Sequence, residues 1–219
     1  MLDTAQTGWQ SSAWDVVARL GEVDGSAVHP HLSLLISTRA ASRDLSDAVH
    51  ALCAVHGDHP DLAAEARTHC IQPDACDWLD AVAEAFAGER AYIARLAAAA
   101  GPLPSTPGQA ETETALLTSR HAIAMLAKSE RRGCATGAVA ALVHDWATIR
   151  LLLDHAASRF GVEAVPATFP PIANTASSVA MLGGTPATER AVSFGAQQLL
   201  AQHRAIWDVL EARASAREG

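Results

Sequence analysis

The stretch QQLLAQHRAIWDVL, residues 197–210, carries the helical period on which the prediction of the fold rests. Apolar side chains return every three or four residues at Leu199, Ile206 and Leu210, a spacing that places them on one face of an α-helix. His203 occupies a position on this face where the pattern calls for an apolar residue. The stretch therefore predicts a helix that packs against other helices and turns an imidazole toward their core.

The same period recurs along the chain, which is rich in alanine, the best helix former, and contains only 5% aromatic residues. It predicts further helices over residues 9–20, 30–55, 61–69, 74–100, 106–132, 136–160 and 187–214. Asp74, Thr106 and Thr185 are the expected N-caps of three of them. The expected fold is therefore all-α: one domain over residues 1–219, an antiparallel bundle of about five long helices with shorter ones.

A long irregular segment, residues 161–187, precedes the last helix and is rich in proline, glycine and small residues. One interpretation is a lid over one end of the bundle, because long connections in compact domains are often functional. The other is a structural crossover, because parallel neighbouring helices need a long return path. We prefer the crossover.

Composition narrows the classes of function. The formal net charge is −8 and Lys128 is the lone lysine, so the chain lacks the basic patch typical of nucleic-acid binding. The first residues do not have the pattern of a signal peptide, and the most apolar run, residues 133–143, is too short to span a bilayer. We therefore expect a cytoplasmic protein without nucleic-acid or membrane partners, with its four cysteines reduced. A homo-oligomer is compatible with the sequence.

Four ionisable residues lie about mid-helix on faces that the pattern predicts to be buried, or next to them: Glu89, His121, Asp145 and His203. Glu89 interrupts an apolar stripe in the same way as His203 does. For His121, a rival face of its helix, which carries Arg120, is an equally good core side. Buried ionisable groups are costly unless they are paired or bound to a ligand, so we expect these four side chains to converge.

Two carboxylates and two imidazoles can bind iron, manganese or zinc inside a bundle. A ferritin-like di-iron centre is excluded, because it needs Glu-x-x-His pairs and this chain has none. The simpler interpretation is structural: Glu89 pairs with Arg120 or another arginine, and His203 is a satisfied core histidine. A second histidine and cysteine cluster offers weaker zinc ligands, because its spacing matches no known motif; it comprises His56, His59, His69, Cys70 and Cys76.

Three functional hypotheses follow. The first is a bundle that binds a metal ion or a small molecule at an internal polar site formed by the four residues. The second is a non-catalytic interaction or regulatory protein whose polar core residues fix the register of the helices. The third is a metal-dependent oxygenase or hydrolase acting beneath residues 161–187. An exposed apolar stripe on the last helix would favour the second.

Overall fold

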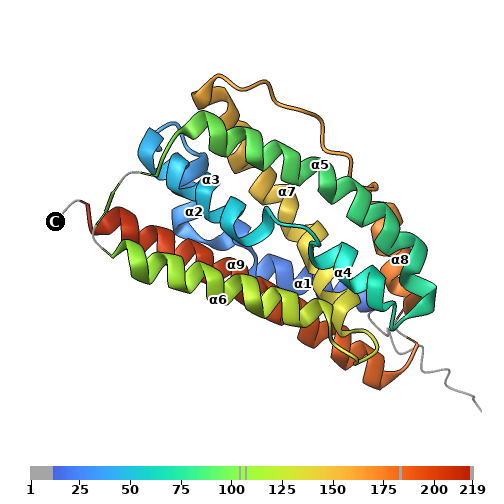
Figure 1. Cartoon of the computed structure of the whole chain (residues 1–219). Helices are drawn as coiled ribbons and strands as arrows, with labels where there is room; N and C mark the ends of the chain where they lie inside the picture. Colours follow the sequence, from blue (N-terminus) through green and yellow to red (C-terminus); the bar gives the residue numbers. More distant parts are fainter. Residues whose placement is uncertain (1–11, 104, 107, 183, 218–219) are drawn as a thin grey trace, which may run out of the picture.

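The computed structural model describes residues 12–103, 105–106, 108–182 and 184–217, which form helices and loops without a β-strand (Figure 1). The all-α bundle in a single compact domain is confirmed. In chain order its elements are α1 (Ala13–Asp24), η1 (Ser26–Val28), α2 (Pro30–Ile36), α3 (Ser42–His56), α4 (Leu62–His69), η2 (Pro73–Ala75), α5 (Cys76–Ala100), α6 (Gln109–Ala127), α7 (Cys134–Phe160), α8 (Ile172–Leu182) and α9 (Pro186–Ser215). None of these helices is both long and apolar enough to cross a membrane.

Helix α7 lies at the centre of the bundle, with α5 on one side and α9 along the other (Figure 1). Small residues let α7 and α9 approach closely. A Cβ atom on Gly137 would lie 2.2 Å from the Val192 carbonyl oxygen, and one on Gly195 would lie 2.0 Å from the Cys134 carbonyl oxygen. Only glycine fits at either position, so this crossing fixes the register of the two longest helices.

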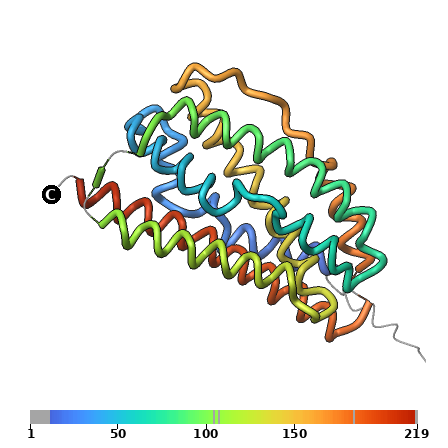
Figure 2. The backbone as a smooth tube through the Cα atoms, viewed as in Figure 1, coloured from blue at the N-terminus to red at the C-terminus, as the bar shows by residue number. Residues whose placement is uncertain are grey.

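The α7 and α9 helices run parallel to each other, whereas α6 runs antiparallel to α9 (Figure 2). Gly137 meets Val192 and, about two turns further along α7 and about three turns further along α9, Asp145 meets His203. A parallel pair needs a return path along the length of the bundle. Residues 161–171 and α8 provide it, and the extended part follows α5 (Figure 2), where the Thr168 hydroxyl donates to the Ala85 carbonyl oxygen at 3.4 Å. This is the geometry of a crossover.

The helix predicted over residues 30–55 is two helices, α2 and α3, and the expectation of one is wrong. Ser37 ends α2: its hydroxyl donates to the Leu34 carbonyl oxygen at 2.7 Å and accepts the Arg39 N–H at 3.2 Å. Serine side chains compete in this way with the backbone bonds of a helix. The first helix also starts later than predicted, at Ala13 after the N-cap Ser12; residues 9–11 of the predicted helix lie outside the described residues.

Of the three predicted N-caps, Thr185 is confirmed, since its hydroxyl accepts the Thr188 N–H at 3.2 Å. Asp74 instead lies within η2, and α5 begins after it. Thr106 is drawn into a tertiary contact, in which its hydroxyl accepts from Arg217 Nε at 3.1 Å, and α6 begins only after Gly108. A long-range contact therefore overrides the local capping pattern at Thr106.

Candidate functional site

The structure brings Asp145 and His203 together in the core between α7 and α9. His203 Nδ1 lies 2.6 Å from Asp145 Oδ2, and the His203 side chain has essentially no exposure to solvent. Ser26, in the turn after α1, donates both its backbone N–H (2.7 Å) and its hydroxyl (2.5 Å) to the same carboxylate. Trp207 Nε1 in turn donates to the Ser26 hydroxyl oxygen at 2.8 Å. Four groups from three elements thus fix the orientation of the His203 ring.

The hydrogen bonds determine the charge of the carboxylate and the proton position on the ring. Burial raises the pKa of Asp145, but the hydrogen bonds from His203 and Ser26 outweigh burial and leave the pKa below 3.8. Because an ionised carboxylate only accepts, Nδ1 of His203 carries a proton. Nε2, at the other side of the ring, is buried and has no hydrogen-bond partner among the described residues. Such an arrangement presents one imidazole nitrogen in a fixed direction.

A second buried imidazole, His56 at the end of α3, packs edge-to-face against His203 with the ring centres 5.1 Å apart. Trp146 and Phe86 also meet its ring, at 5.3 and 6.0 Å. Nε2 of His56 is buried and, within the described ranges, lacks a hydrogen-bond partner. Burial lowers the pKa of His56 well below 6.5; His203 lowers it further, and Asp145 opposes the change. His56 is therefore a neutral imidazole at neutral pH.

His56 lines a cavity of about 210 Å³ between the end of α3, α4 and α6, and 5% of its surface stays exposed. Part of the wall is apolar, formed by Val55, Leu62, Ile123, Ala124 and Ala127. Its charged residues are paired with each other or with a neighbour: Arg120 with Asp58, Lys128 with Glu65, and Asp61 with Arg90. The cavity therefore combines an apolar wall and paired charges with the neutral imidazole of His56, and a second imidazole, His59, lines it at an exposed position.

Glu89 belongs to a different network, and the expectation that it joins His203 is wrong. Arg150 donates to Glu89 Oε1 at 2.7 Å and Trp146 Nε1 donates to Oε2 at 2.9 Å, so both carboxylate oxygens are bonded. Arg150 also donates to Asp154 at 2.8 Å and to the Val165 carbonyl oxygen of the crossover. The interpretation of Glu89 as the partner of an arginine is confirmed, with Arg150 in the place of Arg120.

A tyrosine completes this second network. The Tyr92 hydroxyl donates to Asp154 Oδ1 at 3.0 Å, and the Arg150 guanidinium lies 4.4 Å above the Tyr92 ring. Burial and the hydrogen bond to Asp154 raise the pKa of Tyr92 to about 12. The network therefore joins α5, α7 and the crossover.

His121 lies exposed on α6, so the four predicted site residues do not form one cluster. The physical reason is the rotation of α6, which buries the rival face with Leu116 and Ile123. Among the described residues, only a different set brings three metal-ligating atoms within 4.8 Å of one another: His29, Asp208 and Glu211.

His29 is poorly prepared to bind a cation. Its Nδ1 accepts the His31 N–H at 3.2 Å, so in the neutral ring the proton sits on Nε2, which faces Asp208 at 3.1 Å. A metal ion would have to displace that proton. Asp208 and Glu211 are moreover exposed, and we assign no metal site to this group.

The weaker zinc cluster does not form either. Cys70 and Cys76 are joined in a disulfide, so the expectation of reduced thiols is wrong for this pair, while Cys53 and Cys134 are free. The segment between α4 and α5 folds back on itself and places the two sulfur atoms together, which the spacing alone did not indicate. Disulfides are more typical of oxidising compartments, so a cytoplasmic location stays a prediction.

Sequence reasoning missed the pairing of His56 with His203 and the part played by Ser26. His56 directly follows the helix predicted over residues 30–55 and continues the helical spacing of Val49 and Leu52, which was a usable signal of burial. Ser26 carried no signal, because a serine in a turn is ordinary and its carboxylate partner lies 119 residues away.

The geometry can be compared with known proteins. The model of one family, described as a family of unknown function (DUF6975), matches residues 21–218. The chain belongs to the DUF6975 family. No curated protein and no solved structure matches it. The match includes Ser26, His56, Asp145 and His203, so the whole core network lies within the region that defines the family.

Proposed function

We propose that this DUF6975 protein binds a small polar molecule in the cavity beside His56, with the Asp145–His203 pair behind that imidazole. The observation that carries the proposal is the unpartnered Nε2 of His56, a buried imidazole that lines a cavity. Leaving a buried polar group without a partner costs about 1–3 kcal/mol. Because Nε2 itself is buried, a ligand in the cavity completes this hydrogen bond only when the His56 ring turns toward it.

The cavity narrows the class of ligand. At about 210 Å³ it is smaller than the roughly 300–1,000 Å³ of pockets for drug-sized molecules. A neutral imidazole offers one N–H donor and one acceptor nitrogen, and the rim charges are already paired. A compact, uncharged ligand with a hydroxyl or carboxamide group fits both conditions.

The hydrolase hypothesis gains no support from the core network. In a serine hydrolase the histidine lies between the serine and the acid, so that it can accept the hydroxyl proton. Here Asp145 lies between Ser26 and His203, and the Ser26 hydroxyl donates to the carboxylate. We therefore treat the network as support for a binding site.

The interaction hypothesis is also less well supported. Its expected sign was an exposed apolar stripe on the last helix. Within the described part of α9, Phe194 is the one large apolar side chain that is exposed, at 41%. The polar core does tie helices together, but this is compatible with a ligand in the adjacent cavity.

The test is a screen of small amides and alcohols by ligand-observed NMR, followed by titrations that monitor tryptophan fluorescence, because Trp146 touches His56. His56→Phe keeps a ring at this position but removes the hydrogen bond, so we expect at least a tenfold loss of affinity for any hit. The matched control is His121→Phe, at an exposed position on α6 outside the cavity, which should bind normally. Equal binding by the His56→Phe variant would refute the proposal.

A further inference from the structure

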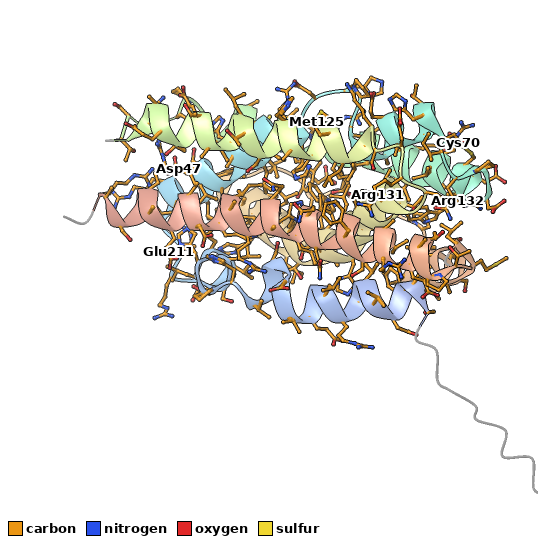
Figure 3. The ribbon with its side chains drawn as sticks, turned by 90° about the horizontal axis from the view of Figure 1, so that it is seen from below. Asp47, Cys70, Met125, Arg131, Arg132 and Glu211 are labelled. Atoms are coloured by element: carbon orange, nitrogen blue, oxygen red, sulfur yellow. A yellow bond between two sulfur atoms is a disulfide. The ribbon has the colours of Figure 1, made fainter. Side chains whose placement is uncertain are left out.

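A second cavity, of about 220 Å³, lies at the opposite end of α6 from the first and is enclosed by α3, α6 and α9. It is separate from the site proposed above, since no residue lines both cavities. Figure 3 shows Asp47, one of its lining residues, in the space between α6 and α9 at this end of the bundle. The surface inside this cavity is almost entirely hydrocarbon, contributed by Ala51, Ala54, Leu103, Leu116, Leu117 and Leu210.

The leucine and alanine side chains form a buried floor and an open mouth. Ala51, Leu116 and Leu210 are buried. Leu103 and Leu117, in contrast, have 39% and 59% of their surface exposed. Exposed leucines beside buried ones make an apolar depression that a molecule can enter from solvent.

The buried carboxylate in the wall offers no charge to a ligand. Asp47 Oδ2 accepts from Arg213 Nε at 2.9 Å and from Arg217, so two guanidinium groups offset its charge. Its other oxygen, Oδ1, is buried and has no accessible surface in the cavity. An ion in this cavity would therefore lose its hydration without gaining a partner of opposite charge.

Neighbouring polar side chains of the wall are bonded to protein groups as well. His50 Nε2 lies 2.8 Å from the Gly101 carbonyl oxygen, and Gln109 Nε2 donates to Glu113 Oε1 at 2.9 Å. A water molecule in a cavity needs two to four hydrogen-bond partners, whereas apolar surface gains free energy by leaving water. The cavity therefore favours a neutral apolar molecule over water or an ion.

We infer that this cavity binds a compact, uncharged hydrocarbon, such as an aromatic ring with a two-carbon arm. Apolar cavities of about 150 Å³ hold a benzene molecule, and pockets for drug-sized ligands begin at roughly 300 Å³. The volume of about 220 Å³ lies between these two sizes. Contacts with the leucine and alanine side chains hold the ligand, and His56 takes no part in its binding.

Three probes of nearly equal shape test the requirement for a neutral apolar ligand: ethylbenzene, benzyl alcohol and the benzylammonium ion, titrated into the full chain and followed by protein-observed NMR. We expect ethylbenzene to bind at least tenfold more tightly than benzyl alcohol, whose hydroxyl group would be buried without a partner, and benzylammonium to bind more weakly still. No binding of ethylbenzene, or equal or tighter binding of either polar probe, would overturn the inference.

The same titrations with the His56→Phe variant separate this inference from the function proposed above. Ethylbenzene should bind that variant as tightly as it binds the parent chain, because His56 does not line the second cavity. Loss of ethylbenzene binding in His56→Phe would place the molecule in the first cavity and refute the second site.

Two variants at exposed leucines locate the site. Leu117→Asp places a carboxylate at the mouth of the cavity, and we expect it to weaken ethylbenzene binding at least tenfold. The matched control is Leu151→Asp, at a leucine of α7 that is 57% exposed and lies outside the cavity, which should bind normally. Unchanged binding by Leu117→Asp would refute the site. A dimer of the parent chain that Leu117→Asp dissociates, together with no ethylbenzene binding, would assign the apolar mouth to a second copy of the chain instead.

Discussion

Two polar networks begin at adjacent residues of α7 and differ in how completely they are paired. From Trp146 the network reaches Glu89 and Arg150, and both oxygens of the Glu89 carboxylate are bonded. From Asp145 the network reaches His203 and then the ring of His56, where an imidazole nitrogen on each ring lacks a partner among the described residues. A closed network holds helices together. In the other network one of the rings with an unpaired nitrogen, His56, lines a cavity, which is the basis of the proposed ligand site.

A substitution in the fully paired network of Trp146, Glu89 and Arg150 should have the largest effect on stability. Arg150→Met leaves the Glu89 carboxylate, only 2% exposed, with Trp146 as its remaining bonded partner. Removing one member of a buried ion pair costs about 3–5 kcal/mol, so the free energy of unfolding should fall by that amount. Urea unfolding at pH 7 measures it.

The double variant Glu89→Gln, Arg150→Met is the control, because it leaves no unpaired charge at position 89, while Asp154 loses Arg150 in both variants. It should regain at least half of the lost stability, since replacing both members of a buried pair is far less costly than removing one. A loss below about 1 kcal/mol in the single variant would show that the network is not the closed structural unit described here.

The network of Asp145, His203 and His56, which contains unpaired nitrogens, should affect how the stability of the protein depends on pH. In the unfolded chain His56 takes up a proton below about pH 6.5, whereas in the folded protein burial keeps its pKa well below that value. The unfolded state then binds more protons, so the free energy of unfolding falls as the pH drops below 6.5, by up to about 1.4 kcal/mol per pH unit from this group.

His56→Phe removes that contribution and an unpaired buried nitrogen. We expect it to be at least as stable as the parent at pH 7 and to lose less stability between pH 7 and 5 in thermal and urea unfolding. Part of the slope should persist, because burial also lowers the pKa of His31. An unchanged slope would mean that His56 is not a neutral buried imidazole.

The smallest effect belongs to a residue outside both networks. His121→Ala replaces an exposed side chain on α6 and should change the free energy of unfolding by less than about 0.5 kcal/mol, because surface substitutions away from structural features rarely do more. Circular dichroism during urea unfolding checks this. A decrease of more than about 1 kcal/mol in the free energy of unfolding would show that His121 contributes to the core.

The sequence alone determined the helical class and much of the core, because a period of three to four residues is a local property of the chain. It also placed Glu89, Asp145 and His203 correctly as buried polar groups, since each lies on or beside an apolar stripe. His121 was misplaced because two faces of its helix were equally good candidates for the buried side. Only the packing of α6 against α9 and α3 decides which face is buried.

Which buried groups meet was decided by the tertiary structure. The parallel alignment of α7 and α9, set by the close contact at Gly137 and Gly195, puts Asp145 against His203. The packing of α5 against α7 pairs Glu89 with Arg150, and the packing of α3 against α7 and α9 turns His56 toward His203. Periodicity shows that a side chain faces inward, but the partner that it finds there depends on the register between helices distant in sequence, which no local pattern encodes.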